Sequence, residues 1–215
     1  MLILGTRSPL VVEVEETLFR CGIAISGAIA VDGPSRLLRY RDVIALAAFQ
    51  PTEGQPFIPC AFSSERRREL FGIGVRLGLA PAPALVDPTS VVASSVRVGD
   101  GTFINAAAVI GAATMIGDGV LINRAASVGH HCIIGDFVSI GPGATLAGNI
   151  RVGEGTIIGA GAVILPDLRI GAGSIVSAGS VVRGHVPDNT LVAGHPARPH
   201  PYNPRRSSLN VPGGE

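Results

Sequence analysis

The sequence lacks tryptophan and has few aromatic residues of any kind, only 4% of its 215 positions. A chain of this length is long enough for two small domains or one large one. With so few aromatic rings, its core must be built from isoleucine, valine, leucine and alanine. Such a core suits a stacked repeat of small side chains, and the 29 glycines and the hydrophobic content of 47% agree with that.

The sequence also has almost no net charge, no paired cysteine motif and no long apolar run. The formal net charge is +1 without an extended basic tract, so nucleic acid is not an expected partner. The run Arg66–Arg68 is interpreted as the solvated face of a helix. Cys21, Cys60 and Cys132 lack the spacing of a metal site or a disulfide framework. "MLILGTRS" is too short for a signal peptide and no segment reaches membrane-spanning length, so we expect a cytoplasmic protein without a membrane partner.

A period of six residues dominates the second part of the chain. Every sixth residue from Val86 to Val182 is valine, isoleucine or leucine, seventeen in unbroken register, and the commonest residue after them is glycine. Helices repeat at 3.6 residues and half-buried strands at two, so neither explains this period. We interpret each hexad as a short strand and a corner, in which the aliphatic residue fills the interior and glycine relieves the turn. The sequence therefore predicts a parallel β-helix.

The first 84 residues begin with a strand, a helix and a second strand. "MLILG" has the character of a buried strand that ends in glycine. The helix that follows is predicted to have Ser8 as its N-cap, Pro9 at its first position and Gly22 at its end. The next strand, in "IAISGAIAVDG", ends near Asp32.

A second helix within 36–49, a strand within 55–62 and a helix that starts at the serine pair 63–64 complete this part. Alternating strands and helices predict a small parallel-sheet α/β unit of Rossmann-like type. Its ligand site is expected at the carboxyl ends of the strands, near Gly5–Ser8 and Asp32.

These patterns divide the chain into three parts. Residues 1–84 form the α/β domain, residues 85–198 the β-helix domain and residues 199–215 a flexible tail. "PAPALVDP" is the expected link into the β-helix, and the tail is too rich in proline and polar residues to pack.

The hexads resemble those of the hexapeptide-repeat acyltransferases, whose consensus is an aliphatic residue, glycine, two variable residues, a small residue and one more. The resemblance covers residues 86 to about 186. It implies a left-handed helix, three hexads per triangular coil and homotrimers with active sites between neighbouring subunits. The handedness is taken from the resemblance, because right-handed crossovers are the general rule between parallel strands.

Two adjacent histidines interrupt the repeat in "SVGHHCIIGDF", residues 127–137. In a coil of about eighteen residues, positions one coil apart stack at the spacing of parallel strands, about 4.8 Å. A histidine next to a glycine N–H suits acyl transfer, because the imidazole can take a proton from an attacking amine or hydroxyl while the amide stabilises the oxyanion. The expected stacked pairs are His130 beneath Gly148, His131 beneath Asn149 and Asn105 beneath Asn123.

Two other interpretations of His130 compete with catalysis. One is a surface histidine on a tolerant corner, which the repeat context makes less favoured. The other is a metal site, which would need three converging imidazoles. Adjacent His130 and His131 are expected to point to different sides of a strand, and His185, His195 and His200 lie several coils away. We therefore expect no metal site.

The succession of an α/β unit and this β-helix resembles the bacterial nucleotide-sugar N-acetyltransferases that act on 4-amino sugars, such as those for bacillosamine and perosamine. Related sialic-acid O-acetyltransferase-like proteins share the architecture. The resemblance rests on Asn123, on His130 followed by "CIIGDF", on "AGN" at 147–149 and on "VAGHPAR" at 192–198. It implies that His130 is the general base, that the Gly148 amide meets the acetyl carbonyl and that Asn123 orders the site at the subunit boundary.

Acetyl-CoA is the co-substrate that this resemblance implies. Its groove is expected along the glycine- and alanine-rich segment 159–182 and the closing motif at 192–198. The residues assigned to it are Gly148, Gly159, Ala160, Ala178, Gly179 and Pro196.

Two departures from the family pattern lie near the base and in the α/β unit. His131 stands where the family has an acidic residue that would orient the base. Either another carboxylate takes this role, for example from the neighbouring subunit, or turnover is slower. "PCAFSSE", residues 59–65, lacks the Gly-(Asn/Asp) turn of the relatives.

The third departure is the first loop, "GTRSPL", which lacks the family's glycine-rich turn. Gly5, Arg7 and Ser8 at the start of the helix are candidates for binding a sugar-nucleotide phosphate. Asp32 matches a position that contacts the nucleotide base in the relatives. A plain strand-to-helix turn at 5–10 and a turn role for Asp32 are the competing interpretations.

The predicted function is acetyl-CoA-dependent N-acetylation of the 4-amino group of a nucleotide-linked sugar by a homotrimer. O-acetylation of a sugar or sialic acid is the first alternative. The second is a non-catalytic trimer that binds a nucleotide sugar.

Overall fold

The computed structural model describes residues 1–201. The first part holds a parallel five-stranded sheet with the strand order β3-β2-β1-β4-β5 and two helices. The predicted Rossmann-like unit is therefore present. None of the helices within residues 1–201 has the length and apolar character needed to cross a membrane. The elements are β1 (Leu2–Leu4), α1 (Val11–Arg20), β2 (Gly27–Ala30), β3 (Val43–Ala45), β4 (Pro56–Pro59), α2 (Ser64–Arg76) and β5 (Ala80–Pro81).

Helix α1 forms as predicted but begins later than expected. Val11 donates its backbone N–H to the Ser8 carbonyl at 3.0 Å, and the Ser8 hydroxyl accepts from the Leu10 N–H at 3.3 Å. Ser8 thus caps a turn in front of the helix, with Pro9 at the second turn position that proline favours. The predicted helix end at Gly22 is confirmed by the left-handed conformation of this residue, φ +66°. Of the serine pair 63–64 predicted to start α2, Ser63 is the N-cap, and its hydroxyl accepts from the Arg66 N–H.

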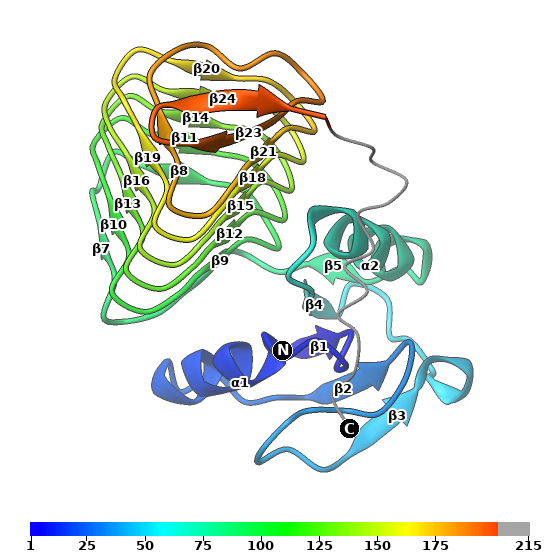
Figure 1. The fold of residues 1–215 in the computed structure, drawn as a ribbon. Helices are drawn as coiled ribbons and strands as arrows, with labels where there is room; N and C mark the ends of the chain where they lie inside the picture. Colours follow the sequence, from blue (N-terminus) through cyan, green and yellow to red (C-terminus); the bar gives the residue numbers. More distant parts are fainter. Residues whose placement is uncertain (202–215) are drawn as a thin grey trace.

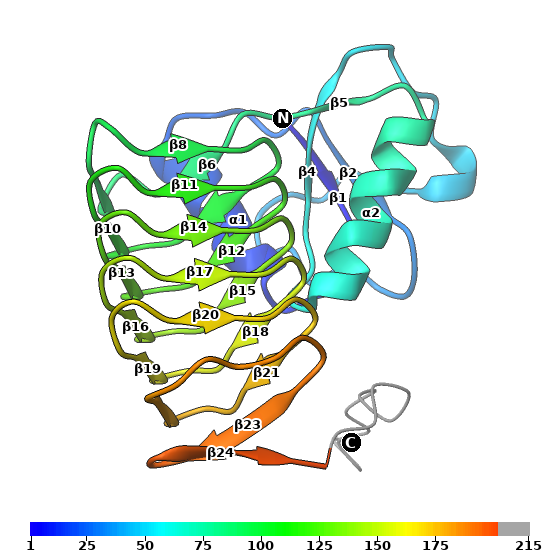
Figure 2. The same cartoon turned by 90° about the horizontal axis from the view of Figure 1, so that it is seen from above.

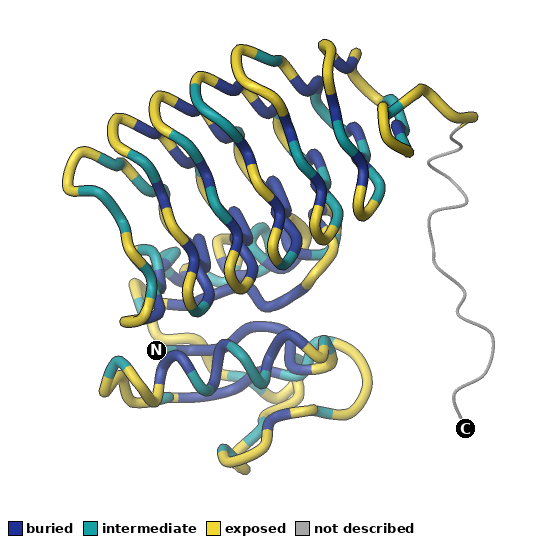
Figure 3. Tube along the Cα trace, turned by 60° about the vertical axis from the view of Figure 1, so that its left-hand side comes forward, coloured by how far each residue is buried: buried dark blue, intermediate teal, exposed yellow. Residues whose placement is uncertain are grey.

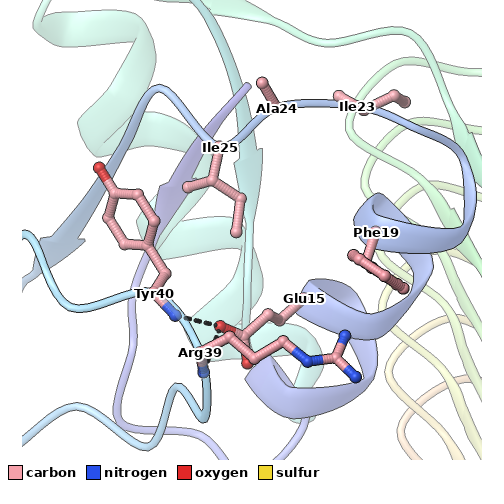
Figure 4. Close-up of a pocket in the computed structure, with 7 residues that line it drawn as sticks. All are labelled: Glu15, Phe19, Ile23, Ala24, Ile25, Arg39 and Tyr40. Carbon is pink, nitrogen blue, oxygen red and sulfur yellow. Dashed lines mark hydrogen bonds between the residues drawn. The ribbon is translucent and has the colours of Figure 1, made fainter.

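The helix predicted within 36–49 is wrong. The segment instead contains β3 and a short 3-10 helix, Leu46–Ala48. The buried side chain of Glu15 in α1 points its carboxylate at the start of this segment (Figure 4). Burial would raise the pKa of Glu15, but three backbone hydrogen bonds hold it below its usual value. The N–H donors, at 2.7–2.9 Å, are those of Leu38, Arg39 and Tyr40.

The second part is a left-handed parallel β-helix of three sheets, seen almost along its axis in Figure 1 and from the side in Figure 2. We number the sheets as faces in chain order. Face 1 contains β6 (Leu85–Val86), β9 (Phe103–Ile104), β12 (Leu121–Ile122), β15 (Ser139–Ile140), β18 (Ile157–Ile158), β21 (Ile175–Val176), β23 (Leu191–Gly194) and β24 (Ala197–His200). Face 2 contains β7 (Val91–Val92), β10 (Val109–Ile110), β13 (Ser127–Val128), β16 (Thr145–Leu146), β19 (Val163–Ile164) and β22 (Val181–Val182). Face 3 contains β8 (Arg97–Val98), β11 (Met115–Ile116), β14 (Ile133–Ile134), β17 (Arg151–Val152) and β20 (Arg169–Ile170).

The coil length follows from the strand register. Val109 pairs with Ser127 and Thr145 with Val163, and both pairs are 18 positions apart (127 − 109 and 163 − 145). Three hexads therefore complete one coil, as the resemblance implied. The aliphatic residues of the repeat fill the interior, while the corners lie at the surface (Figure 3). The last coil is shorter, because Ile175 pairs with Leu191, 16 positions on.

The α/β unit packs on the outer side of face 1. Phe103 and Leu121 point outward from β9 and β12 and join the core of α1 and the sheet. Asp87, just after β6, is buried and bonds to Thr17 and Arg20 of α1 at 3.0 and 3.1 Å. Burial alone would raise the pKa of Asp87, but its hydrogen bonds and the nearby guanidinium lower it. The carboxylate is therefore charged at neutral pH and ties the two parts together.

Arg67 of α2 makes the second connection, at the corner between faces 3 and 1. Its side chain is only 2% exposed, and burial lowers its pKa to about 9, which leaves it charged at neutral pH. Its guanidinium donates to carbonyls on both parts and to one hydroxyl. These acceptors are the carbonyls of Ala61, Phe62, Gly119, Phe137 and Val138 and the hydroxyl of Ser139.

The far end of the chain differs from the predicted tail. Pro199 and His200, which were assigned to the tail, lie in β24, which pairs antiparallel with β23. Residues 202–215 of the predicted tail lie outside the described residues.

Replacing Arg67 by methionine is expected to keep the side-chain volume but to remove every donor from this corner. Three of the six acceptors, the carbonyls of Ala61, Gly119 and Phe137, have no other donor within residues 1–201, and each buried acceptor left without one costs at least about 1 kcal/mol. We therefore expect R67M to lower the free energy of unfolding by about 3 kcal/mol, measured by urea denaturation. The matched control is R68M, which removes a half-exposed ion pair to Glu154 and should cost no more than about 1 kcal/mol. Equal losses in the two variants would contradict the role of Arg67.

Candidate active site

His130 and Gly148 occupy neighbouring coils at the corner between faces 2 and 3. Asn149 donates its N–H to the His130 carbonyl at 2.8 Å, which confirms the predicted stacking. A Cβ atom added to Gly148 would lie only 2.7 Å from Cε1 and from Nε2 of the imidazole. The tip of the His130 ring therefore occupies the space that any larger residue at position 148 would need.

The backbone N–H of Gly148 has no hydrogen-bond acceptor within residues 1–201. At the same position of some other hexads a carboxylate from the next coil accepts this N–H. Asp118 accepts from the Asp100 N–H, and Asp136 accepts from the Asp118 N–H. Gly148 thus has a free N–H and a side against which the tip of the His130 ring, with Cε1 and Nε2, is packed. A base next to an unused amide donor is the arrangement that acyl transfer needs.

The side chains of His130 and His131 converge instead of pointing to different sides of a strand, so that prediction is wrong. Their Nδ1 atoms are 3.0 Å apart, and the ring planes are nearly perpendicular at 86°. The reason is that both residues lie on a corner rather than in a strand. His131 adopts the left-handed conformation with φ +56°, which turns its side chain back towards its neighbour. Within residues 1–201 no three His, Cys, Asp or Glu side chains are grouped as metal ligands.

Asn123 lies at a different corner, between faces 1 and 2. Its Oδ1 accepts from Asn105 Nδ2 at 3.2 Å, as the predicted stacking requires, and the side chain is buried. Strand β13 separates Asn123 from His130, so one chain does not bring the two predicted catalytic side chains together.

Of the residues assigned to the acetyl-CoA groove, Gly159, Ala160, Ala178 and Gly179 follow the corner of Asn123 towards the end of the β-helix, whereas Gly148 lies at the corner of His130. The Gly179 N–H donates to the Ala160 carbonyl at 2.8 Å. At Gly159 the backbone N of Ala178 in the next coil is so close that there is no room for a side chain. Next to Gly179, space for a side chain is open. Pro196 is apart from this column, in the turn between β23 and β24 after a cis peptide bond. Small residues thus leave an open path along this corner.

A cavity of about 260 Å³ joins the α/β unit to the corner of Asn123. It lies beyond the carboxyl ends of β1 and β4, where the strand order of the sheet reverses, and ligands of such sheets bind at this point. Its lining comes from the loop after β1, from α1, from the loop after β4 and from the β-helix. The lining residues are Ser8, Pro9, Leu10, Glu13, Phe62, Asn123 and Arg124.

Comparisons with known proteins agree with this architecture. The model of the bacterial transferase hexapeptide family (six repeats) matches residues 113–148 and 149–184. PerB from Caulobacter crescentus, solved with CoA and GDP-perosamine, is 30% identical over 93% of this chain and 96% of its own, with a TM-score of 0.85. The chain belongs to the left-handed β-helix sugar acetyltransferases.

Two further structures are similar to this acetyltransferase over nearly their whole length. The acetyltransferase domain of PglB from Neisseria gonorrhoeae, solved with acetyl coenzyme A, is 31% identical over 93% of this chain and 98% of its own, with a TM-score of 0.82. WeeI from Acinetobacter baumannii is 25% identical over 93% and 99%, with a TM-score of 0.79. The comparison with curated protein sequences gives no match.

In the first loop of the acetyltransferase, only glycine fits at position 5. This residue is buried with φ +90°, and a Cβ atom would lie 2.5 Å from Leu70 Cδ1. Glycine is therefore needed here for packing against α2, whatever the loop binds. Arg7 and Asp32 form an exposed ion pair at 3.4 Å, next to Ser8 at the carboxyl edge of the sheet.

Several residues at this edge were not assigned to the site from the sequence. Arg66, interpreted as part of a solvated helix face, has its guanidinium on Asp32 at 2.8 Å. Glu13 pairs with Arg124 at 2.6 Å across the cavity wall. No short motif could have identified them, because Arg66 meets Asp32 only when α2 packs on the sheet, and Glu13 meets Arg124 only when the α/β unit packs on the β-helix. Phe62 could have been suspected from the sequence, because it is a large apolar residue directly before the serine cap of a helix. In the structure its side chain is 48% exposed.

G148A is expected to slow acetyl transfer about 100-fold while the β-helix persists. The added methyl group collides with the His130 ring and must displace it by about 1 Å, a shift that costs about 100-fold in rate at an active site. Steady-state turnover and thermal unfolding of the variant test this. G184A is the control, since an added Cβ atom meets nothing within 4 Å there and the backbone is not left-handed. Similar turnover in both variants would contradict the proposed geometry of the corner.

Proposed function

We propose that this protein transfers an acetyl group from acetyl-CoA to the 4-amino group of a nucleotide-linked sugar. The observation that carries the proposal is the packing of the His130 ring tip, which includes Nε2, against Gly148, a residue whose N–H is free within residues 1–201. Two similar structures support the choice of substrates, because one contains CoA with GDP-perosamine and another contains acetyl coenzyme A.

His130 acts as the general base in this reaction. Its Nε2 takes the proton as the amine nitrogen bonds to the acetyl carbon, and the proton passes on to the sulfur when the carbon–sulfur bond breaks. The Gly148 N–H donates to the carbonyl oxygen as negative charge develops on it. A positioned general base contributes about 10²–10⁴-fold to a rate, and one oxyanion donor about 10²–10³-fold.

Acetyl-CoA, which supplies the acetyl group as a thioester, fits the open corner between faces 1 and 2. The residues that would hold it are Gly159, Ala160, Ala178 and Gly179, with Pro196 at the end of the groove. The open space at Gly179 and the close backbone stacking at Gly159 support this assignment, since side chains there would fill the path.

The active protein is a homotrimer in this proposal. Asn123 and His130 lie at different corners, so a site that contains both needs His130 of the partner subunit next to Asn123. Faces 2 and 3 leave apolar side chains exposed that a neighbouring subunit would cover. These include Val91, Val109, Met115 and Ile133.

The acceptor sugar occupies the cavity at the reversal of the strand order, and the nucleotide lies on the carboxyl edge of the sheet. Arg7, Ser8 and Asp32 are there, with Gly5 shaping the loop, which makes residues 1–84 the nucleotide-sugar domain and residues 85–198 the acyltransferase domain. The exposed Arg7 guanidinium suits a phosphate group, which arginine binds by charge-assisted hydrogen bonds.

Release of CoA thiol from acetyl-CoA, screened against UDP-, dTDP- and GDP-linked 4-amino sugars and sialic acid, tests the function. We expect turnover with one nucleotide-linked amino sugar. Turnover with sialic acid alone would replace N-acetylation by O-acetylation. Nucleotide-sugar binding without thiol release from any acceptor would mean a non-catalytic binding protein.

H130A is expected to lower kcat by about 10²–10⁴-fold, because the general base is lost. Sedimentation of the variant should still give the mass of a trimer, since the side chain is exposed and supports no core. H185A is the matched control, an exposed corner histidine outside the proposed site. Unchanged turnover in H130A would exclude His130 as the base, and loss of the fold would mean that it is structural.

A further inference from the structure

His131 is the sole hydrogen-bond partner of the His130 ring among residues 1–201. The contact joins the two Nδ1 atoms at 3.0 Å, while Nε2 of His130 is the atom next to Gly148. Nδ1 of the base is thus hydrogen-bonded to His131, and Nε2 faces the corner where the proposed reaction occurs.

Only one hydrogen atom can lie between two Nδ1 atoms, so the two rings share their protonation pattern. A neutral imidazole carries hydrogen on one nitrogen and a lone pair on the other. For Nε2 of His130 to accept a proton, its Nδ1 must carry the hydrogen and donate it to His131. His131 must then accept with its own Nδ1 and hold its hydrogen on Nε2.

No carboxylate in the adjacent coils can do this in place of His131. The coil below presents Ala112 and Ala113 at this corner, since His131 donates its N–H to the Ala112 carbonyl. The coil above presents Gly148 and Asn149. The next ionisable group in the column is Asp167, where the Asn149 side chain donates to the carboxylate at 2.7 Å.

The other titratable group at this corner is Cys132. Its Sγ lies 3.3 Å from the Ala147 carbonyl, and burial raises the pKa of the thiol, so it is neutral and supplies no charge to the histidines. Within one subunit, the protonation of His130 therefore depends on His131.

We propose that His131 is a positioning residue, which accepts a hydrogen bond from Nδ1–H of His130 and so keeps Nε2 of His130 free to take the substrate's proton. This inference rests on the proposed function of His130 as the base. Beyond that function, the inference is that the neutral imidazole of His131 orients the base, as a carboxylate does in the family pattern. A second proton on the pair would occupy both Nε2 atoms, so the neutral pair is the active form and activity falls as the pH decreases.

Three substitutions of His131 separate positioning from a structural role. The corner tolerates them, because alanine, asparagine and aspartate already adopt the same left-handed conformation at Ala113, Asn149 and Asp167 of this column. H131A removes the acceptor, H131N replaces it by a neutral amide oxygen and H131D by a charged carboxylate.

We expect H131A to lower kcat more than about tenfold, but less than H130A, with KM values within about twofold of wild type, because the base remains but is not oriented. H131N should restore kcat to within about threefold. In H131D the carboxylate stabilises protonated His130, so the acid limb of kcat/KM should move to higher pH by about one unit. Unchanged kcat in H131A, or equal losses in H131A and H131N, would overturn the proposal; the first result would leave the orienting role to a carboxylate of another subunit.

The protonation pattern can be measured without any turnover. In ¹⁵N spectra of the imidazoles of the full-length protein, with signals assigned by their loss in H130A and H131A, neutral His130 should carry its hydrogen on Nδ1. A hydrogen on Nε2 of His130 would overturn the proposal even if the enzyme is active. If the spectra agree but no acceptor supports thiol release, the proposed function fails and the hydrogen-bond assignment stands.

Discussion

The stacking of one coil on the next is the constraint on which the structure depends. Each short strand bonds to the strand 18 residues later, as Val109 with Ser127, and the aliphatic residues of the repeat stack in the interior at the same interval. A single inserted residue would turn the interior side chains of all later coils outward. The same register decides which corner residues lie above one another, so it also sets the chemistry of each corner.

The two parts of the chain are held together by buried charge as well as by apolar packing. Asp87 reaches α1 from the first coil, and Arg67 reaches the corner between faces 3 and 1 from α2. Both groups are charged and almost fully buried, and each has enough hydrogen bonds to offset the loss of water. Because these contacts fix the α/β unit relative to the β-helix, the cavity of Ser8, Phe62 and Asn123 between them keeps a defined shape.

The corner of His130 shows how a repeat protein can carry a reactive group at little cost to its fold. His130 is exposed and its neighbours in the column are small, so the ring takes no part in the core. The glycine above it leaves room for the ring and an unused N–H. His131 contributes through its left-handed backbone, a conformation that seven other non-glycine residues of the β-helix share.

The sequence by itself determined the β-helix, and with the coil of three hexads that the family resemblance implied it also predicted the stacking of His130 beneath Gly148 and of Asn105 beneath Asn123. These features are periodic, and a period of six is visible without knowledge of distant contacts. Only the tertiary structure decided the path of residues 36–49, because β3 in this segment pairs with β2 and the Glu15 carboxylate that binds the N–H groups of residues 38–40 comes from another element. The meeting of the two Nδ1 atoms was likewise hidden, since it depends on one backbone angle at a corner and not on the order of the residues.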